Sequence, residues 1–408
     1  MINNKYVKLR KMKYFSLCIL ILFIFMLIKK HKKYFDDESS FFTSWATGVY
    51  QALFPPIKLD NNSIRQVIRV SSGGEKIRIK FSNIIGETKL EIKKVSIADL
   101  INNSVINDRT LKYVTFKGKH SIIIERNQEQ YSDTIFFPLK TFSKIAISIY
   151  LGSVPKKLSG HDYSYTYSYI EKGYKINKKH FSNSNKVAHL YFISTLEISS
   201  EHPNEVIVCF GDSITDGVKF NKDIRDNYPD ILFQKLYNNK MTSNISVVNV
   251  GINADILILK GIKRFKHDVI DIKKIKYIIC LYGVNDINVL NAKSEIIISN
   301  YKQIIKKAHK KNILIYAGTI LPFGRYKVKY IWNKKKEEER LKVNKWIRET
   351  SPENGGFDSF FDFDNYLKDP KNSSLLRNVY DSGDGIHPSV EGYKKMVEAI
   401  NINSFYKQ

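Results

Sequence analysis

The chain has 408 residues, 43% of them hydrophobic, which is enough for two ordinary domains with apolar cores and a terminal segment. Its formal net charge is +26, but the lysines are spread along the whole chain, without zinc-finger spacing or an aromatic RNA-binding signature. These patterns disfavour nucleic-acid binding, and we interpret the charge as a solvated basic surface, with attraction to anionic lipid or glycan as the alternative.

An uninterrupted apolar run, YFSLCILILFIFMLI, occupies residues 14–28 and has lysine-rich segments on both sides. A helix rising ~1.5 Å per residue over this run is somewhat shorter than the ~30 Å hydrocarbon core of a membrane, but snorkelling lysines can make up the difference. No small-x-small cleavage site follows the run. We therefore predict a membrane-spanning signal anchor over residues 1–34, with a cleaved signal peptide as the alternative.

Residues 43–200 alternate between apolar and polar residues, as half-buried strands do. In EKIRIKFSN, for example, Ile77, Ile79 and Phe81 alternate with charged residues, and SSGG and NIIGE provide turn signals nearby. We predict a β-sandwich accessory domain over this range. The stretch HDYSYTYSYI predicts a strand whose tyrosines share one face, which either packs on a neighbouring domain or binds sugar rings. These tyrosines are Tyr163, Tyr165, Tyr167 and Tyr169.

Strands alternate with helices from residue 203 to 408, which predicts an α/β domain built on a doubly wound parallel sheet. The helix SEIIISNYKQIIKKAHKK is amphipathic. The segment YKVKYIWNKKKEEERLKVNKWIRE predicts a loop that leads into a charged helix with a solvated face. The expected strands are 206–210, 246–250, 277–282 and 312–319, and the expected apolar face of the amphipathic helix contains Ile297, Tyr301, Ile304 and Ala308.

Three short segments of this half carry residues suited to catalysis. VIVCFGDSITDG places Ser213 in a turn after a buried strand, and KYIICLYGVND ends another buried strand at Asn285. YDSGDGIHPS places Asp384 three residues before His387. A serine hydroxyl needs a base to act as a nucleophile, and histidine suits that task because its pKa lies near neutral pH. Asp384 could fold back to accept from His387 Nδ1 and fix the tautomer of the ring.

Together these segments resemble the blocks of the GDSL or SGNH family of serine esterases and acylhydrolases, in the family's chain order. The blocks are GDS at Gly211, Asp212 and Ser213, GxND at Gly283, Asn285 and Asp286, and DxxH at Asp384 and His387. The resemblance runs from about Thr43 to the end and is strongest to a secreted branch with a β-rich domain before the hydrolase. It implies a flavodoxin-like SGNH hydrolase domain over 203–408, located outside the cytoplasm as a membrane-anchored or secreted protein.

The resemblance also implies an oxyanion hole made by the backbone N–H of Ser213, the side-chain amide of Asn285 and a backbone N–H of the second block. In VVNVGINAD, Ala254 takes the position that is glycine in the family. Alanine keeps the N–H, but its Cβ would be unfavourable at a position that requires positive φ. Asp212 and Asp286 are expected to brace the turns around Ser213 and Asn285 through hydrogen bonds to the backbone.

We therefore expect a serine esterase or acylhydrolase that cleaves carboxylic esters through an acyl-enzyme on Ser213, with Asp384 and His387 completing the triad. No metal or cofactor is expected, because no metal-ligand spacing is visible around the three cysteines, and we predict no disulfide. The expected partners are an ester of a lipid or an acylated carbohydrate, and a membrane through the N-terminal segment, but no nucleic acid. An acyltransferase with the same triad is one alternative. A non-catalytic glycan-binding protein, supported by Ala254 and the tyrosine stretch, is another.

Overall fold

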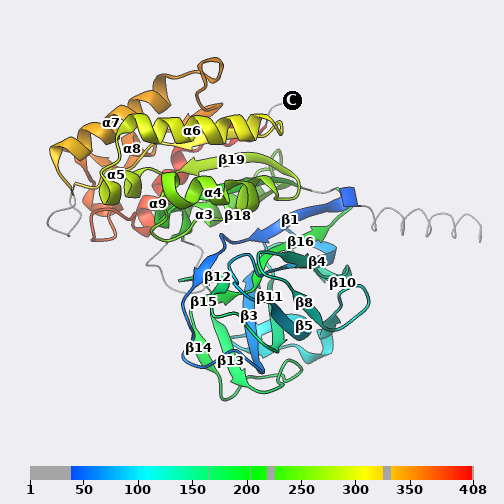
Figure 1. Cartoon of the computed structure of the whole chain (residues 1–408). Coiled ribbons are helices and arrows are strands. Elements are labelled where there is room, and N and C mark those ends of the chain that lie inside the picture. The colour runs from blue at the N-terminus through cyan, green and yellow to red at the C-terminus, as the bar shows by residue number, and fades with distance from the viewer. Residues whose placement is uncertain (1–37, 165, 203, 218–225, 325–331, 407–408) are drawn as a thin grey trace, which may run out of the picture.

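The computed structural model describes residues 38–406, except for positions 165, 203, 218–225 and 325–331. The predicted signal anchor over residues 1–34 lies outside the described residues, as does Tyr165 of the tyrosine stretch. In the part of the chain that is described, no helix has the length and apolar character needed to cross a membrane. The described chain forms a β-rich region followed by an α/β region, which lie against each other (Figure 1).

The β-rich region is built mainly on two antiparallel sheets. One runs in the order β1-β16-β4-β10, with β9 also paired to β4, and the other runs β14-β13-β3-β11-β5-β6, with β7 and β8 also paired to β5. The strands of the first sheet are β1 (Phe41–Ala46), β4 (Gly74–Ser82), β9 (Glu129–Tyr131), β10 (Ile135–Leu139) and β16 (Ile193–Ser199). Those of the second are β3 (Asn62–Arg69), β5 (Leu90–Asn102), β6 (Val105–Ile106), β7 (Lys112–Val114), β8 (Ile122–Ile124), β11 (Lys144–Leu151), β13 (Ser168–Lys172) and β14 (Asn185–Val187).

The alternation in the sequence determines which faces of these sheets are buried. Ile77, Ile79 and Phe81 of β4 are fully buried, and so are Ile147 and Ile149 of β11 in the other sheet. All belong to one continuous apolar core. A smaller sheet runs in the order β15-β12-β2 and consists of β2 (Tyr50–Ala52), β12 (Leu158–Asp162) and β15 (His189–Tyr191). The prediction of a β-rich region before the hydrolase is therefore confirmed.

The tyrosine stretch is not the single strand that we predicted. β12 ends at Asp162 and β13 begins at Ser168. Between them, Tyr163 has a left-handed backbone with φ 58° and a half-exposed side chain, whereas Tyr169 on β13 is buried. The prediction of one aromatic face is wrong because the turn that begins at Tyr163 interrupts the period-two alternation.

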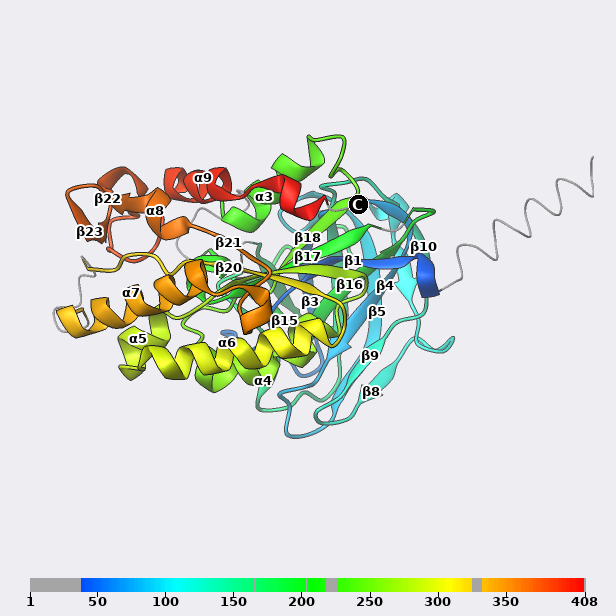
Figure 2. The same ribbon diagram turned by 90° about the horizontal axis from the view of Figure 1, so that it is seen from above.

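The α/β region contains a parallel sheet in the order β18-β17-β19-β20-β21. Every residue from Val206 to Phe210 of β17 is fully buried, as expected for a strand covered on both faces. Figure 2 shows α3 and α9 on one side of this sheet and α4 and α6 on the other. The strands are β17 (Glu205–Gly211), β18 (Ile245–Asn249), β19 (Ile275–Leu281), β20 (Leu314–Gly318) and β21 (Ser359–Phe361). The predicted doubly wound sheet is confirmed, and β21 is a short strand that the sequence analysis missed.

The helices of this region are α2 (Ser213–Asp216), α3 (Tyr228–Tyr237), α4 (Ile262–Phe265), α5 (Val284–Leu290), α6 (Ser294–His309), α7 (Lys334–Glu349), α8 (Phe363–Leu367) and α9 (Val390–Ala399). A short hairpin of β22 (Lys368–Asp369) and β23 (Asn372–Leu376) follows α8. The apolar face predicted for α6 is buried as expected, including Ile297 and Tyr301. From β17 the chain runs to β18 on one side and then to β19 on the other, so the strand order reverses there. Open α/β sheets bind their ligands at such a point.

The charged helix α7 differs from its prediction. Lys336, Glu339 and Arg340 are buried rather than solvated. The Arg340 guanidinium donates to Asp364 Oδ1 at 2.6 Å and to the Ile320 carbonyl at 2.9 Å. One face of the helix is therefore an internal ion-pair network, which the mixed charges of the sequence did not reveal.

The two regions meet along β1. Its Thr43 N–H donates to the Lys273 carbonyl at 3.3 Å, and Ser246 Oγ of the edge strand β18 donates to the Thr43 carbonyl at 3.1 Å. The Ser246 hydroxyl also lies 2.7 Å from Ser71 Oγ. The first strand of the β-rich region thus lies against the edge strand β18, which pairs with β17, the strand that precedes the predicted nucleophile.

Candidate active site

The turn after β17 presents Ser213 as the first residue of α2. Asp212 caps the helix, because its Oδ1 accepts from the Ile214 N–H at 3.0 Å. A Cβ at Gly211 would lie 2.0 Å from Thr215 Oγ1 and 2.6 Å from the Leu281 carbonyl, so no side chain fits there. The brace expected from Asp212 is present, and Gly211 allows the turn to pack against the end of β19.

Ser213, His387 and Asp384 lie in one hydrogen-bonded line. Ser213 Oγ is 2.8 Å from His387 Nε2, and His387 Nδ1 is 2.7 Å from Asp384 Oδ2. Because the carboxylate accepts at Nδ1, the neutral ring carries its hydrogen there and turns the lone pair of Nε2 toward the serine. The structure therefore brings the predicted triad residues together, although 174 positions separate Ser213 from His387.

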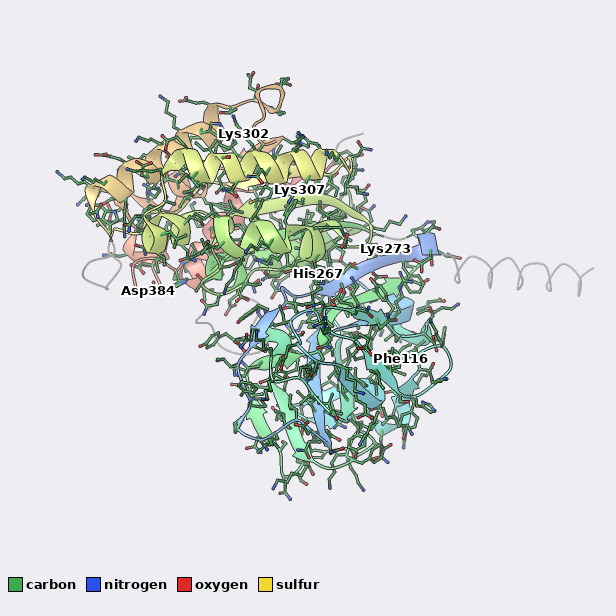
Figure 3. The ribbon with its side chains drawn as sticks, viewed as in Figure 1. Phe116, His267, Lys273, Lys302, Lys307 and Asp384 are labelled. Carbon is green, nitrogen blue, oxygen red and sulfur yellow. The ribbon has the colours of Figure 1, made fainter. Side chains whose placement is uncertain are left out.

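The loop that holds the histidine is fixed by its own backbone. Asp384 Oδ1 accepts from the N–H groups of Ile386 at 3.0 Å and His387 at 2.9 Å. Two positive-φ glycines, Gly383 at 95° and Gly385 at 82°, let the chain turn this tightly. Figure 3 labels Asp384 at the lower left of the α/β region. The loop thus fixes the orientation of the ring before any substrate arrives.

Asn285 lies in the first turn of α5, after Gly283 with its φ of 112°. This φ explains the glycine, because a side chain would be strained there, and a Cβ would also require Ile320 Cδ1, 2.4 Å away, to move. The Asn285 side-chain amide donates one hydrogen to the Asp255 carbonyl at 3.0 Å. A primary amide has two hydrogens, so this bond orients the group and leaves a second donor.

Ala254 adopts a left-handed backbone with φ 56° and is exposed. Glycine is favoured in this conformation, and glycine is what the family pattern has at this position. The alanine therefore adds a Cβ that is sterically unfavourable at positive φ. The next residue, Asp255, supplies the carbonyl that orients Asn285. The second and third blocks are therefore in direct contact.

Asp286 does not brace the turn at Asn285 as predicted. Its carboxylate accepts from the N–H groups of Leu257 at 3.2 Å and Ile258 at 3.0 Å. It therefore caps the helical segment Leu257–Gly261, which follows the second block. Burial raises the pKa of Asp286 to about 6, against the opposing effect of these two N–H groups. Asp286 of the third block is therefore hydrogen-bonded to the segment that follows the second block.

Arg264 on α4 is a site residue that sequence reasoning missed. Its guanidinium donates to the carbonyls of Gly211 at 3.0 Å and Val250 at 2.7 Å, and to the hydroxyl of Tyr282 at 2.6 Å. These acceptors lie at or just beyond the carboxyl ends of β17, β18 and β19. Arg264 also pairs with Asp255 at 2.7 Å and with Asp268 at 2.8 Å. In the sequence, this arginine lies in a lysine-rich segment, and no nearby motif indicates its role.

The family comparison covers the α/β region. Residues 207–400 match the model of the GDSL-like lipase/acylhydrolase family. A search of curated proteins finds no significant match.

Several solved structures resemble this region. A protein from Desulfitobacterium hafniense assigned to the G-D-S-L lipolytic family is 24% identical, covering 48% of this chain and 97% of its own, with a TM-score of 0.38. A member of the lipolytic G-D-S-L family from Veillonella parvula is 18% identical, with coverages of 48% and 95% and a TM-score of 0.38. A GDSL-like lipase from Bacteroides thetaiotaomicron is 18% identical, with coverages of 48% and 85% and a TM-score of 0.38. Taken with the blocks and their geometry, the family match shows that this chain carries, over residues 207–400, a domain of the GDSL-like lipase/acylhydrolase family.

Proposed function

We propose that the protein is a serine esterase or acylhydrolase that cleaves carboxylic esters through an acyl-enzyme on Ser213. The observation that carries this proposal is the hydrogen-bonded line from Ser213 Oγ to His387 Nε2 at 2.8 Å and from His387 Nδ1 to Asp384 Oδ2 at 2.7 Å. A base in contact with the hydroxyl and an acid that orients the base are the two requirements of an activated serine.

In the proposed reaction, Ser213 Oγ bonds to the ester carbonyl carbon while its proton moves to His387 Nε2. The bond to the alcohol oxygen then breaks, and His387 returns the proton to that oxygen. Water attacks the acyl-enzyme with His387 again accepting a proton, so that the carboxylic acid leaves and the Ser213 hydroxyl is restored. Asp384 stays ionised and stabilises the imidazolium in both halves.

The oxyanion formed at each step needs donors that are already in position. Ser213 is the first residue of α2, so its N–H has no acceptor within that helix. Asn285 offers its second amide hydrogen, since the first is held by Asp255. The Ala254 N–H is the third proposed donor, from the exposed turn beside Asp255.

The test uses the full chain with chromogenic esters of short and long acyl chains. Ser213→Ala should abolish turnover and covalent labelling by a fluorophosphonate, because it removes the only atom proposed to attack. Ser243→Ala is the matched control, since Ser243 is exposed on a loop and bonds only locally, to the Lys240 carbonyl. Absence of labelling in the unsubstituted chain would contradict the proposal and favour a non-catalytic glycan-binding protein.

The class of ester and of acceptor remains part of the proposal. The chain-length profile separates a lipid ester from an acetylated carbohydrate, because the two need acyl pockets of different length. Adding a sugar alcohol to the assay distinguishes hydrolysis from acyl transfer by the product that forms. The proposed site of action, outside the cytoplasm and attached to a membrane, depends on residues 1–34 and stays a prediction.

A further inference from the structure

His161 of the β-rich region lies directly against the helix that begins at Ser213. Its Nε2 is 3.1 Å from Asp216 Oδ1, and its Nδ1 is 3.0 Å from the Gly48 carbonyl. Asp216 is the last residue of α2, so it lies one helical turn from the proposed nucleophile. Figure 1 shows β12, which carries His161, at the side of the β-rich region next to the α/β region.

Both ring nitrogens of His161 face oxygens that accept hydrogen bonds. A carbonyl oxygen cannot donate, and neither can an ionised carboxylate, so both contacts are satisfied only by the doubly protonated ring. Burial alone lowers the pKa of His161, but the charge and hydrogen bond of Asp216 and the bond to Gly48 outweigh it, and the pKa is raised above its ordinary value. The geometry and the electrostatics therefore both indicate a buried imidazolium paired with Asp216.

Other polar groups around His161 are consistent with this pairing. Asp162, next to it on β12, is 2.9 Å from His189 Nδ1 on β15 and adds negative charge near the ring. The ring of Tyr50 on β2 meets the His161 ring edge-on, with centroids 5.8 Å apart. Burial raises the pKa of Tyr50, so the phenol is neutral at ordinary pH. The groups shown in contact with His161 are therefore acidic or neutral, and Arg69 is a cation that lines the same cavity.

The backbone holds α2 closely on its other sides. The Asp216 N–H donates to the Asp212 carbonyl at 2.9 Å, and Asn249 Nδ2 donates to the Thr215 carbonyl at 2.8 Å. A Cβ at Gly251 would lie 2.3 Å from Asp216 N, so the chain of the second block packs against the same residue. A shift of Asp216 would therefore be transmitted to both the first and the second block.

The carboxylate of Asp216 depends on His161 for its charged partner. Among the described residues, its Oδ2 is buried and has no hydrogen-bond partner. His161 and Asp216 both line a cavity of about 130 Å³ between the two regions. Without the imidazolium, Asp216 would be a buried carboxylate that has lost its ion-pair partner among the described residues, and proteins avoid such a state by moving the group or protonating it.

We propose that His161 is a positioning residue for the esterase site, through which the β-rich region holds α2 and so sets the place of Ser213. This inference rests on the proposed function, since it concerns the placement of the same nucleophile. It gives the β-rich region a part in the reaction rather than a separate binding role.

The test compares the full chain with His161→Ala and His161→Gln, with kcat expressed per site titrated by the fluorophosphonate. We expect His161→Ala to lower kcat by about 10- to 100-fold with little change in KM, because a small displacement of the nucleophile affects the chemical step. His161→Gln keeps a donor for Asp216 but not the charge, so it should recover only part of that loss. His309→Gln, which removes an exposed histidine that pairs with Asp358 at 3.0 Å, should leave kcat unchanged.

The pH profile separates positioning from a purely structural role. In the unsubstituted chain, kcat should fall at alkaline pH as His161 loses its proton, and this limb should be absent in His161→Gln. A wild-type kcat in His161→Ala, or an alkaline limb that persists unchanged in His161→Gln, would overturn the inference. If His161→Ala does not fold, the profile of His161→Gln decides alone. Lack of Ser213-dependent turnover in the unsubstituted chain would instead overturn the proposed function.

Discussion

At the scale of single residues, Ala254 has a backbone conformation that favours glycine but carries a Cβ. Its φ of 56° places a Cβ in the left-handed region, and the residue is exposed, so no packing compensates. Ala254→Gly should raise the free energy of unfolding by ~0.5–1 kcal/mol, because relief of ~1–2 kcal/mol of strain exceeds the added chain entropy of glycine. The N–H is kept, so kcat should not fall. Urea denaturation of both proteins gives the difference.

Ala399→Gly provides the matched control for this substitution. Ala399 is the last residue of α9 and precedes a residue with negative φ, so the change brings flexibility without relief of strain. It should lower the free energy of unfolding by up to ~1 kcal/mol. A loss of the same size in Ala254→Gly would contradict the strain that we assign to the second block.

Asp212 is a second residue with a measurable consequence. Burial raises its pKa to about 8, although the Ile214 N–H opposes this, whereas the unfolded chain has a value of about 3.9. Between those values the folded protein holds a proton that the unfolded chain has released, so this residue lowers stability as pH rises. Asp212→Asn keeps the cap and removes the titration. The stability of Asp212→Asn relative to wild type should increase from about pH 4 to about pH 8. Denaturation midpoints at each pH measure this difference. Parallel stability curves for the two proteins would contradict the raised pKa of Asp212.

At the scale of elements, Arg264 joins the ends of three strands. Its donors reach the Gly211 carbonyl, the Val250 carbonyl and the Tyr282 hydroxyl. Arg264→Lys keeps the charge but loses the planar fork, so several of these bonds cannot form together. We expect a loss of ~2–3 kcal/mol in the free energy of unfolding, and a fall in kcat of at least about 10-fold, because the blocks of the site lose their common anchor.

Arg65 supplies the control for this element. It is fully buried in β3 and donates to Ser148 Oγ at 2.8 Å and to the Lys178 carbonyl at 2.7 Å, both within the β-rich region. Arg65→Lys should lower stability by a similar amount and leave kcat per titrated site unchanged. An equal effect of the two substitutions on kcat would mean that Arg264 acts through general stability alone.

At the scale of the whole molecule, His267 connects the two regions, and Figure 3 labels it at their junction. Its Nε2 lies 2.8 Å from Glu129 Oε2 of β9, and its Nδ1 bonds to Asp268. Burial lowers the pKa of His267, but the hydrogen bonds and charges of Asp268 and Glu129 raise it to about 10. Burial alone would raise the pKa of Glu129, yet His267 and Lys80 lower it to about 2.

The sign of the resulting pH dependence follows from these shifts. The unfolded glutamate has a pKa of about 4.3 and the unfolded histidine one of about 6.5, so the pair stabilises the protein fully between those two values. Its effect is lost as pH falls toward about 2, where Glu129 protonates, and as pH rises from about 6.5 to about 10, where His267 deprotonates. Stability of the full chain should fall over this upper window, and His267→Gln should flatten the dependence. Thermal unfolding across the window measures it, with the exposed His309→Gln as control. Parallel curves for wild type and His267→Gln would refute the pairing.

The parts of this molecule that could be predicted from sequence depend on short-range patterns. Ser213 follows a continuous apolar strand, and Asp384 lies three residues before His387. The local sequence was therefore enough to predict these three residues as the site. No short-range pattern indicates the roles of Arg264 and His161, because their acceptors Gly211 and Asp216 lie 53 and 55 positions away in the sequence. The partners of Asp286 are 29 and 28 positions earlier, which is why its predicted role was wrong.

The antiparallel pairing of β1 with β16 has a consequence for the synthesis of the chain. Ser40 and Ser199 lie side by side at the end of this pair, although 159 positions separate them. At ~5–20 residues per second, the apolar strand FFTSWA would wait roughly 8–30 s on the nascent chain before its partner emerges. During that time it is an unpaired edge, open to association with other chains. The β-rich region can close only when the segment that leads into the hydrolase has been made, and the α/β region is completed later, since all of its strands follow Ser199 in the chain.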